Sequence, residues 1–524
     1  MALSLSVPVV TRPLPPEVEV NPKKARAWIE SLPLTKTIES ARAVIQSIEA
    51  MNAAKMPGDE RVAIVEIYRP VVTVLLDELQ AIYAYSSLPL PAKQAEAFDL
   101  SAQLITQCCY AYKMLLLEKT GKMILFNAKK SLPGPLFWSM YYLRAQMLQS
   151  YKVYYPVPHG VWQEMHQLQL FAEEQGLTAE IVDAGVGATA ADLYADALMM
   201  SLADPYRLMY QEADKALDLL KQNRGLVEMR TSAEGLNPLR LFVVAMDSDQ
   251  PPKVLVQGGR PPPGQLLRIV DPGKLVEKLQ QRLRSQTSAS APSAKSRATH
   301  DLTDLMGRLI RLWGDPPKRQ FRRNPTDSAV ALCAGIKAIC YFTELASQED
   351  PEADARAIRE GGTIPLLRIP QDPMSQMIGV EEWHVLNQSA NGLRMHRESG
   401  GSVSVTVGEV VGVRFVGGRT WNVGVVRWLT MLEGNALEFG VELVAPAADS
   451  ITIEPTIGGG RSNPALRLLS LVPEAESDTL LTTPETFADL REFELKGKGE
   501  VHTVRATTLM ERTSRFDMFQ YQES

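Results

Sequence analysis

The hydrophobic period of this sequence changes once along the chain, and that change constrains the fold more than any other feature. Before residue 285, apolar residues recur every three or four positions, the spacing of one helix face. After residue 300 they alternate with polar residues, the spacing of strands with one buried side. Between them lies SQTSASAPSAKSRATH (285–300), whose small polar residues and proline bury little apolar surface. The sequence therefore predicts a helical domain (1–284), a flexible linker (285–300) and a β-rich half.

The first half is predicted to be an all-α helical domain with one short interruption. Around residues 207–224, Met209, Ala213, Leu217 and Leu220 recur at helical steps and mark one apolar face. Similar spacing predicts helices over 36–52, 61–84, 92–119 and 136–151, separated by segments containing proline and glycine. The segment 239–256 has the composition of β-structure set into or against these helices. No motif in this half indicates a known family.

The second half is predicted to form an antiparallel β-barrel followed by a smaller β-module, which makes the whole chain an α+β multidomain protein. The segments VVGVRFV (410–416) and LEFGVELV (437–444) alternate with period two, and glycine-containing turns separate them. AVALCAGIKAICYF (329–342) is the first predicted strand. We place the barrel at 301–446. Alternation continues beyond Pro446 and predicts the C-terminal β-module at 447–524.

Composition excludes several classes of protein. The chain has 524 residues with 55 basic and 61 acidic side chains, a net charge of −6, which argues against DNA or RNA as the partner. It has four cysteines, Cys108, Cys109, Cys333 and Cys340, without a C-x-x-C pair, which predicts a reducing cytoplasm. The first residues, MALSLSVPVV, lack the basic start of a signal peptide, and no apolar stretch is long enough for insertion into a membrane.

Two motifs in the second half could bind a ligand. Arg319, Arg322 and Arg323 crowd into KRQFRR, with R-x-x-x-R spacing between the first and the last. Guanidinium forks suit phosphate oxygens and the guanine edge, although a solvated basic turn has the same composition. Farther on, VLNQSANGL contains Asn387, Ser389 and Gly392 between two predicted strands. Their amide and hydroxyl can bond a base edge, although the same residues also form ordinary turns.

Taken together, R-x-x-x-R before a β-barrel and N-x-S-x-x-G on a strand connection resemble the PilZ family. Members of that family are small β-barrels that bind the bacterial second messenger cyclic di-GMP. The later segments WNVGVVRWLTM and LEFGVEL are also similar to strands of that barrel, so the resemblance covers about 315–445. A segment at 343–379, read as an insertion with a short helix, departs from the family pattern.

The resemblance implies a role for each motif residue. Arg319 and Arg323 would clamp phosphates and guanine edges, with Arg322 as an adjacent basic helper. Asn387 and Ser389 would hold a guanine, and Gly392 would leave room for it. It further implies a cytoplasmic cyclic di-GMP receptor that is not an enzyme, has no catalytic or metal residues and no cofactor, and signals to a protein partner through its helical domain. The alternative is a PilZ-like adaptor that binds protein and no nucleotide.

Two further pairs of residues give weaker evidence of a functional site. Arg427 and Trp428 are neighbours on a predicted strand, so we expect them to point to opposite faces; either could line the pocket mouth, or Trp428 could be core and Arg427 solvated. His159 and His166 lie seven residues apart without a third ligand, so we expect no metal there.

Overall fold

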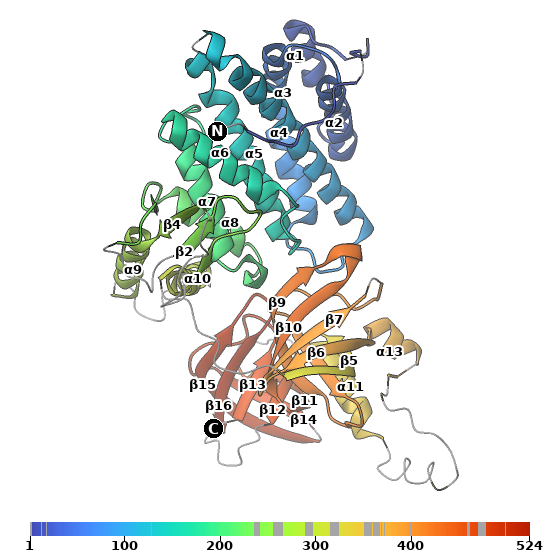
Figure 1. The fold of residues 1–524 in the computed structure, drawn as a ribbon. Helices are drawn as coiled ribbons and strands as arrows, with labels where there is room; N and C mark the ends of the chain where they lie inside the picture. Colours follow the sequence, from blue (N-terminus) through green and yellow to red (C-terminus); the bar gives the residue numbers. More distant parts are fainter. Residues whose placement is uncertain are drawn as a thin grey trace. The chain divides into compact units, whose positions relative to one another are not determined.

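The computed structural model divides the chain into two compact units, each described here by itself (Figure 1). The first contains residues 1–86 and 90–318, and the second contains residues 87–89 and 319–524. The structure describes residues 3–11, 13–16, 18–126, 128–234, 242–254, 266–288, 297–314, 324–349, 359, 367, 369–370, 372–398, 400–457, 462–469, 478–497 and 499–523.

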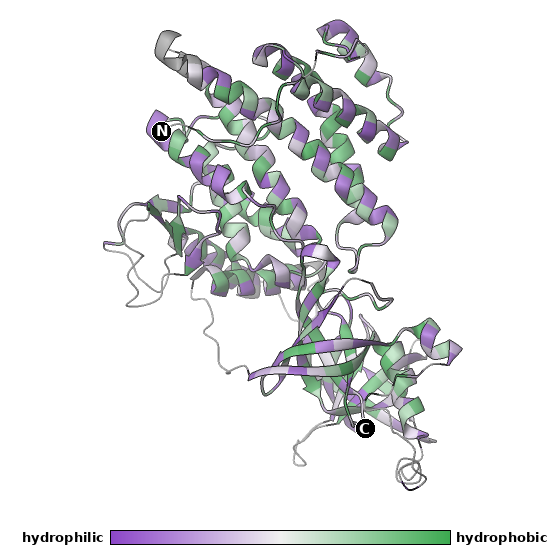
Figure 2. Ribbon diagram, turned by 45° about the vertical axis from the view of Figure 1, so that its right-hand side comes forward, coloured by the Kyte–Doolittle hydropathy of each residue, from purple (hydrophilic) through white to green (hydrophobic). Residues whose placement is uncertain are grey.

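The first unit is built mainly from helices whose apolar faces share one core. The helices predicted over 36–52, 61–84, 92–119 and 136–151 are present, the third of them extending to Phe126, whereas the helix predicted around 207–224 begins only at Glu212. Further helices pack beside them. The α-helices are α1 (Pro22–Glu30), α2 (Thr37–Ala53), α3 (Gly58–Tyr83), α4 (Ala92–Phe126), α5 (Pro133–Lys152), α6 (Val161–Gln175), α7 (Ala190–Leu202) and α8 (Glu212–Lys221), with short 3-10 turns η1 (Ala128–Ser131) and η2 (Pro205–Arg207). Figure 2 shows apolar and polar residues alternating along these helices, as amphipathic packing requires.

The ends of several helices follow from their local sequence. The Asn21 side chain accepts hydrogen bonds from the Lys23 and Lys24 amides and so caps α1. Thr189 and Asp192 form a capping box at the start of α7, in which each side chain accepts from the other residue's backbone N–H. These caps fix where the buried faces begin.

The β-structure predicted over 239–256 is part of a small sheet in the first unit. β1 (Glu228–Arg230), β4 (Leu267–Asp271), β2 (Phe242–Ala245) and β3 (Lys253–Val254) pair antiparallel in that order. Phe242 and Val270 are buried in the helical core. The helical region therefore carries a sheet near its end.

Two helices follow this sheet and change the position of the domain boundary. α9 (Gly273–Ser288) and α10 (Arg297–Gly314) extend into both ends of the segment interpreted as a linker, and residues 289–296 lie outside the described residues. α10 packs in the first unit, where the buried Trp313 indole donates to the Met199 carbonyl at 3.0 Å. The structure thus divides its units after residue 318, whereas the sequence predicted a division at 285–300.

The second unit contains two closed antiparallel barrels of six strands each. The first barrel closes in the order β10-β7-β6-β5-β8-β9. Its strands are β5 (Asn324–Ala334), β6 (Glu381–Gln388), β7 (Gly392–Arg397), β8 (Val410–Phe415), β9 (Asn422–Met431) and β10 (Leu437–Ala445), with the short turn η5 (Glu433–Asn435) before β10. Trp383, Met395 and Phe439 are buried inside it. The predicted barrel is confirmed.

The strand predicted over 329–342 is wrong in its second half. β5 ends at Ala334, and after Gly335 the chain forms the helix α11 (Ile336–Ser347). Gly335 has φ of +90°, a conformation that glycine adopts at little cost and that turns the chain out of the strand. The end of β5 and the start of α11 are both mostly buried, so the apolar run across them in the sequence could not distinguish strand from helix.

The predicted insertion at 343–379 begins within α11 and ends in the short helix α13 (Pro373–Ile378). Its start is anchored where the buried Arg414 guanidinium donates to both oxygens of Glu349 at 3.0 and 2.8 Å. Near its end, Tyr341 of α11 donates to the α13 cap residue Asp372 at 3.2 Å. Most of the stretch between these anchors lies outside the described residues.

The second barrel corresponds to the predicted C-terminal β-module. It closes in the order β11-β12-β13-β16-β15-β14. Its strands are β11 (Ala447–Pro455), β12 (Asn463–Leu469), β13 (Asp478–Thr482), β14 (Glu492–Gly497), β15 (Glu500–Arg512) and β16 (Asp517–Glu523). Phe342 of α11, Trp421 of the first barrel and Phe516 before β16 belong to one buried cluster. The two barrels therefore share a core, and α11 contributes to it.

Across the described residues of both units, none of the helices is long and apolar enough to cross a membrane.

Candidate functional site

Ser389 and Gly392 lie together in the turn that joins β6 to β7. The Ser389 amide donates to the Gly392 carbonyl at 2.8 Å, and its hydroxyl lies 3.4 Å from the same oxygen. A Cβ atom on residue 392 would lie only 2.9 Å from the Ser389 hydroxyl. Glycine at 392 therefore leaves space for the serine hydroxyl in its present position above the turn.

Asn387 lies on the outer face of the first barrel because of a bulge in β6. Simple alternation would place it beside Trp383 and Val385, which are buried inside. The register shifts between Val385 and Asn387, however, and Asn387 pairs with Arg394 across β7. Arg394 itself lies between two residues buried inside the barrel, so both members of the pair face outward. The Asn387 amide has no hydrogen-bond partner in the described part of the chain.

This pair is part of a row that crosses four strands. On the other side of Arg394 lies Gly440 of β10, and opposite Gly440 lies Trp428 of β9. A Cβ atom on residue 440 would lie 1.9 Å from Trp428 Nε1, so the indole lies directly over the glycine. The row thus places an amide, a guanidinium and a half-buried aromatic ring side by side.

The expectation that Arg427 and Trp428 point to opposite faces is wrong. The register between β9 and β10 shifts between Gly440 and Val441, and Arg427 is the extra residue of that bulge. Its guanidinium bonds Glu442, which shares the outer face with Gly440. Both side chains therefore lie on the outer face, with Trp428 in the row and Arg427 in ion pairs.

The three arginines Arg319, Arg322 and Arg323 lie outside the described residues. The strand that follows them is described, and it pairs directly with the asparagine motif. Asn324 is opposite Gln388, and Pro325 is opposite Asn387. The structure therefore brings the start of β5 beside the turn, but it does not test the arginine motif.

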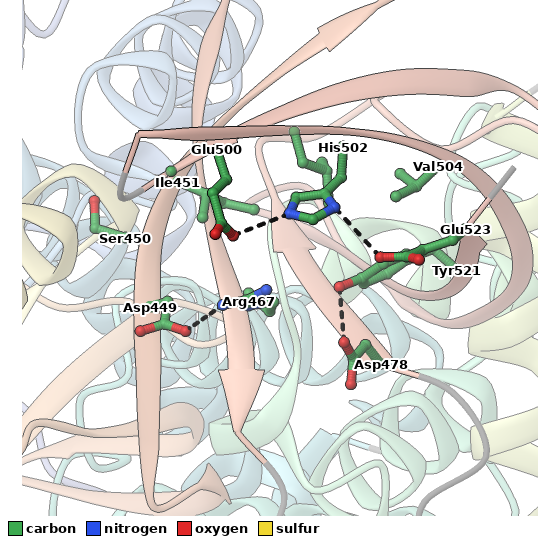
Figure 3. A pocket seen from close by; sticks show the side chains of 12 residues that line it. Asp449, Ser450, Ile451, Arg467, Asp478, Glu500, His502, Val504, Tyr521 and Glu523 are labelled. Atoms are coloured by element: carbon green, nitrogen blue, oxygen red, sulfur yellow. Dashed lines mark hydrogen bonds and ion pairs between the residues drawn. The ribbon is translucent and has the colours of Figure 1, made fainter.

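A small pocket lies in the second barrel, lined by side chains from all six strands (Figure 3). Arg467 bonds Asp449 at 2.7 Å, and Tyr521 donates to Asp478 at 3.0 Å. Burial, followed by the bond to Asp478, raises the pKa of the Tyr521 hydroxyl. The cavity volume is about 70 Å³, the space of about two water molecules, so it is too small for a dinucleotide.

A larger cavity of about 290 Å³ lies in the first unit between α4, α5 and α6. Lys113 and Glu164 form a buried ion pair on its wall, and Glu164 also accepts from the Ser6 amide at 2.6 Å. The other polar groups lining it include Thr106 and Gln146, which bond each other at 3.1 Å. These groups are already paired within the protein.

His166 and His159, the pair considered above for metal binding, differ sharply in burial. His166 is fully buried, with Nδ1 2.8 Å from the Tyr194 hydroxyl and Nε2 3.0 Å from the Gln250 carbonyl. His159 is 96% exposed, so the two do not form a common site. In the described ranges, no group of three or more His, Cys, Asp or Glu residues is arranged to hold a metal ion.

Comparison with known families agrees with the predicted kind of barrel. Residues 241–350 and 371–450 match the model described as the middle PilZ domain of the cyclic-di-GMP receptor FimW. This part of the chain belongs to the PilZ domain family, as the motifs predicted. The match omits residues 351–370, which fall within the predicted insertion.

The N-terminal half, in which the sequence motifs indicated no family, also has a match. Residues 23–233 match the model for the N-terminal domain of the cyclic-di-GMP receptor FimW. The chain is similar to the Cyclic-di-GMP receptor FimW of Pseudomonas aeruginosa, with 24% identity over 586 aligned positions that cover 100% of this chain and 94% of that protein. The two matched domains thus have a counterpart that extends over the whole chain.

Proposed function

We propose that this protein is a receptor for cyclic di-GMP and that its first barrel binds the nucleotide. The observation that carries this proposal is the outer row of β6, β7, β10 and β9. In this row Asn387 presents an amide without a partner among the described residues, and Trp428 presents an aromatic ring. An amide can hydrogen-bond a guanine edge, and an aromatic ring can stack on a base. The family match to the receptor supports the same ligand.

In this proposal the ligand is held from two directions. Asn387 and Ser389 bond one guanine, and Gly392 keeps the turn open for them. Arg319 and Arg323 supply guanidinium forks for the phosphates and guanine edges, assisted by Arg322. Chain connectivity supports this arrangement, because consecutive Cα atoms are about 3.8 Å apart and Arg323 directly precedes Asn324, the partner of Gln388.

The protein acts as a receptor and not as an enzyme, so no bond of the ligand is broken. Nucleotide binding orders the arginine segment against the barrel and changes how the protein engages a protein partner through its helical domain. We place this activity in the cytoplasm, without DNA, RNA or membrane insertion. All four cysteines are buried free thiols, and burial raises the pKa of each, which suits a reducing compartment.

The arginine motif provides a direct test. The double variant Arg319→Ala and Arg323→Ala is expected to weaken cyclic di-GMP binding at least 100-fold with the melting temperature unchanged. The control Arg230→Ala and Arg505→Ala removes the same charge from exposed ion pairs elsewhere. It is expected to keep the affinity of the natural chain. Full affinity in the first variant would contradict the site, and loss in both would show a nonspecific effect of charge.

A further inference from the structure

Arg394 is fixed in place by Glu438. Its Nε and Nη2 atoms donate to Glu438 Oε2 at 3.1 and 2.5 Å, so two of the three guanidinium nitrogens are held by one oxygen. The Glu438 side chain is only 7% exposed, and its other oxygen lies 3.5 Å from His396 Nδ1. The carboxylate therefore holds the arginine side chain in one orientation on the outer face of the barrel. Because the side chain is already ordered, it loses less conformational entropy when it binds a ligand.

The remaining nitrogen of Arg394 is available. Its Nη1 atom, with two N–H donors, has no partner among the residues that the structure describes, and the side chain is 39% exposed. The neighbouring Asn387 amide and Trp428 indole N–H also lack described partners. Hydrogen-bond donors without a partner in the described part of the chain thus gather in one row on adjacent strands.

We propose that Arg394 is a ligand-binding residue that contacts the N7–O6 edge of the guanine held by Asn387. This inference rests on the proposed function and adds to it a residue outside both motifs. The N7 and O6 atoms of guanine are both acceptors, whereas adenine presents an amino donor where guanine has O6. An arginine held from behind by Glu438 therefore favours guanine over adenine at this position.

The test compares two probes on the full chain. One is cyclic di-GMP, and the other is its 7-deazaguanine analogue, which lacks the N7 acceptor. The natural chain is expected to bind the analogue at least fivefold more weakly. Arg394→Ala, with Arg394→Gln as a variant of closer size, is expected to bind cyclic di-GMP at least tenfold more weakly and to lose most of the discrimination between the probes.

Arg505→Ala is the matched control, because Arg505 donates through Nε and Nη2 to one oxygen of Glu492 at 3.2 and 2.6 Å. It is expected to bind both probes as the natural chain does. Unchanged affinity in the Arg394 variants would overturn the assignment. Weaker binding with full discrimination would also overturn it, because the arginine would then contact a phosphate. Failure of the natural chain to bind cyclic di-GMP would instead overturn the proposed function on which this inference rests.

Discussion

Arg427 of the first barrel forms a two-pronged ion pair with Glu511 of the second, with Nη2 2.9 Å from Glu511 Oε2. Its Nε atom also donates to Glu442 at 2.7 Å. Burial alone would lower the pKa of this guanidinium, but the two carboxylates outweigh burial and raise it. Arg427, the neighbour of Trp428 in the bulge of β9, therefore links the two barrels by an ion pair.

We predict that Arg427→Ala lowers the free energy of unfolding of the second unit by about 1–2 kcal/mol, because it removes charge-assisted bonds that are partly shielded from water. Thermal unfolding of the full chain measures this loss. A double-mutant cycle with Glu511→Ala should give a coupling of about 1 kcal/mol between the two residues. Arg505→Ala, which removes an exposed pair within one barrel, should cost less than about 0.5 kcal/mol. Equal losses of stability in Arg427→Ala and Arg505→Ala would show that the ion pair between the barrels contributes no more than an exposed pair within one barrel.

We predict that Gly440→Ala weakens cyclic di-GMP binding about tenfold. The added methyl would fall 1.9 Å from Trp428 Nε1, so the indole must move away from the row. Calorimetric titration of the variant measures the change. Gly307→Ala in α10, where a Cβ meets nothing within 4 Å, serves as the control and should bind normally. If Gly440→Ala also binds normally, the ring position over residue 440 is not part of the site.

We predict that the first unit loses stability as the pH falls below about 6.5, the usual pKa of histidine. Burial lowers the pKa of His166, so the folded protein holds this ring neutral while the unfolded chain takes up a proton. The stability it contributes is therefore present above the unfolded pKa and is lost as the pH falls toward the folded pKa. The loss is at most about 1.4 kcal/mol per pH unit.

Melting temperatures at pH 7.5 and 5.5 check this prediction. His166→Asn should show a smaller fall on acidification than the natural chain, whereas His159→Asn, at a 96% exposed position, should show the same fall. If the melting temperatures of the two variants fall by the same amount between pH 7.5 and 5.5, protonation of His166 does not control the acid sensitivity.

The helices and barrels were predictable because their sequence periods reflect burial. Ala213, Leu217 and Leu220 are buried on one face of α8 as their spacing predicted, whereas Met209 lies before the helix begins at Glu212. The strand predicted over 329–342 failed because a nearly continuous apolar run crosses from β5 into α11, which packs between the two barrels. The α10 helix was missed as part of the first unit because its apolar face gives no sign of which neighbour it packs against.

The sequence named candidate site residues, but it did not predict their geometry. Turn chemistry in the sequence identified Ser389 and Gly392, which the structure brings together. Arg394 and Gly440 were missed, because their position beside Asn387 depends on strand register and on two bulges that alternation cannot reveal. A glycine in the middle of a β-strand, as at 440, was the available signal of close approach by another group.

Calorimetric titration of the full chain with cyclic di-GMP, beside GTP and cyclic di-AMP, tests the central claim most directly. The account predicts selective binding of cyclic di-GMP with a dissociation constant that is micromolar or tighter. Absence of heat at high ligand concentration, together with an unchanged melting temperature, would contradict the account and favour a PilZ-like adaptor that binds protein alone.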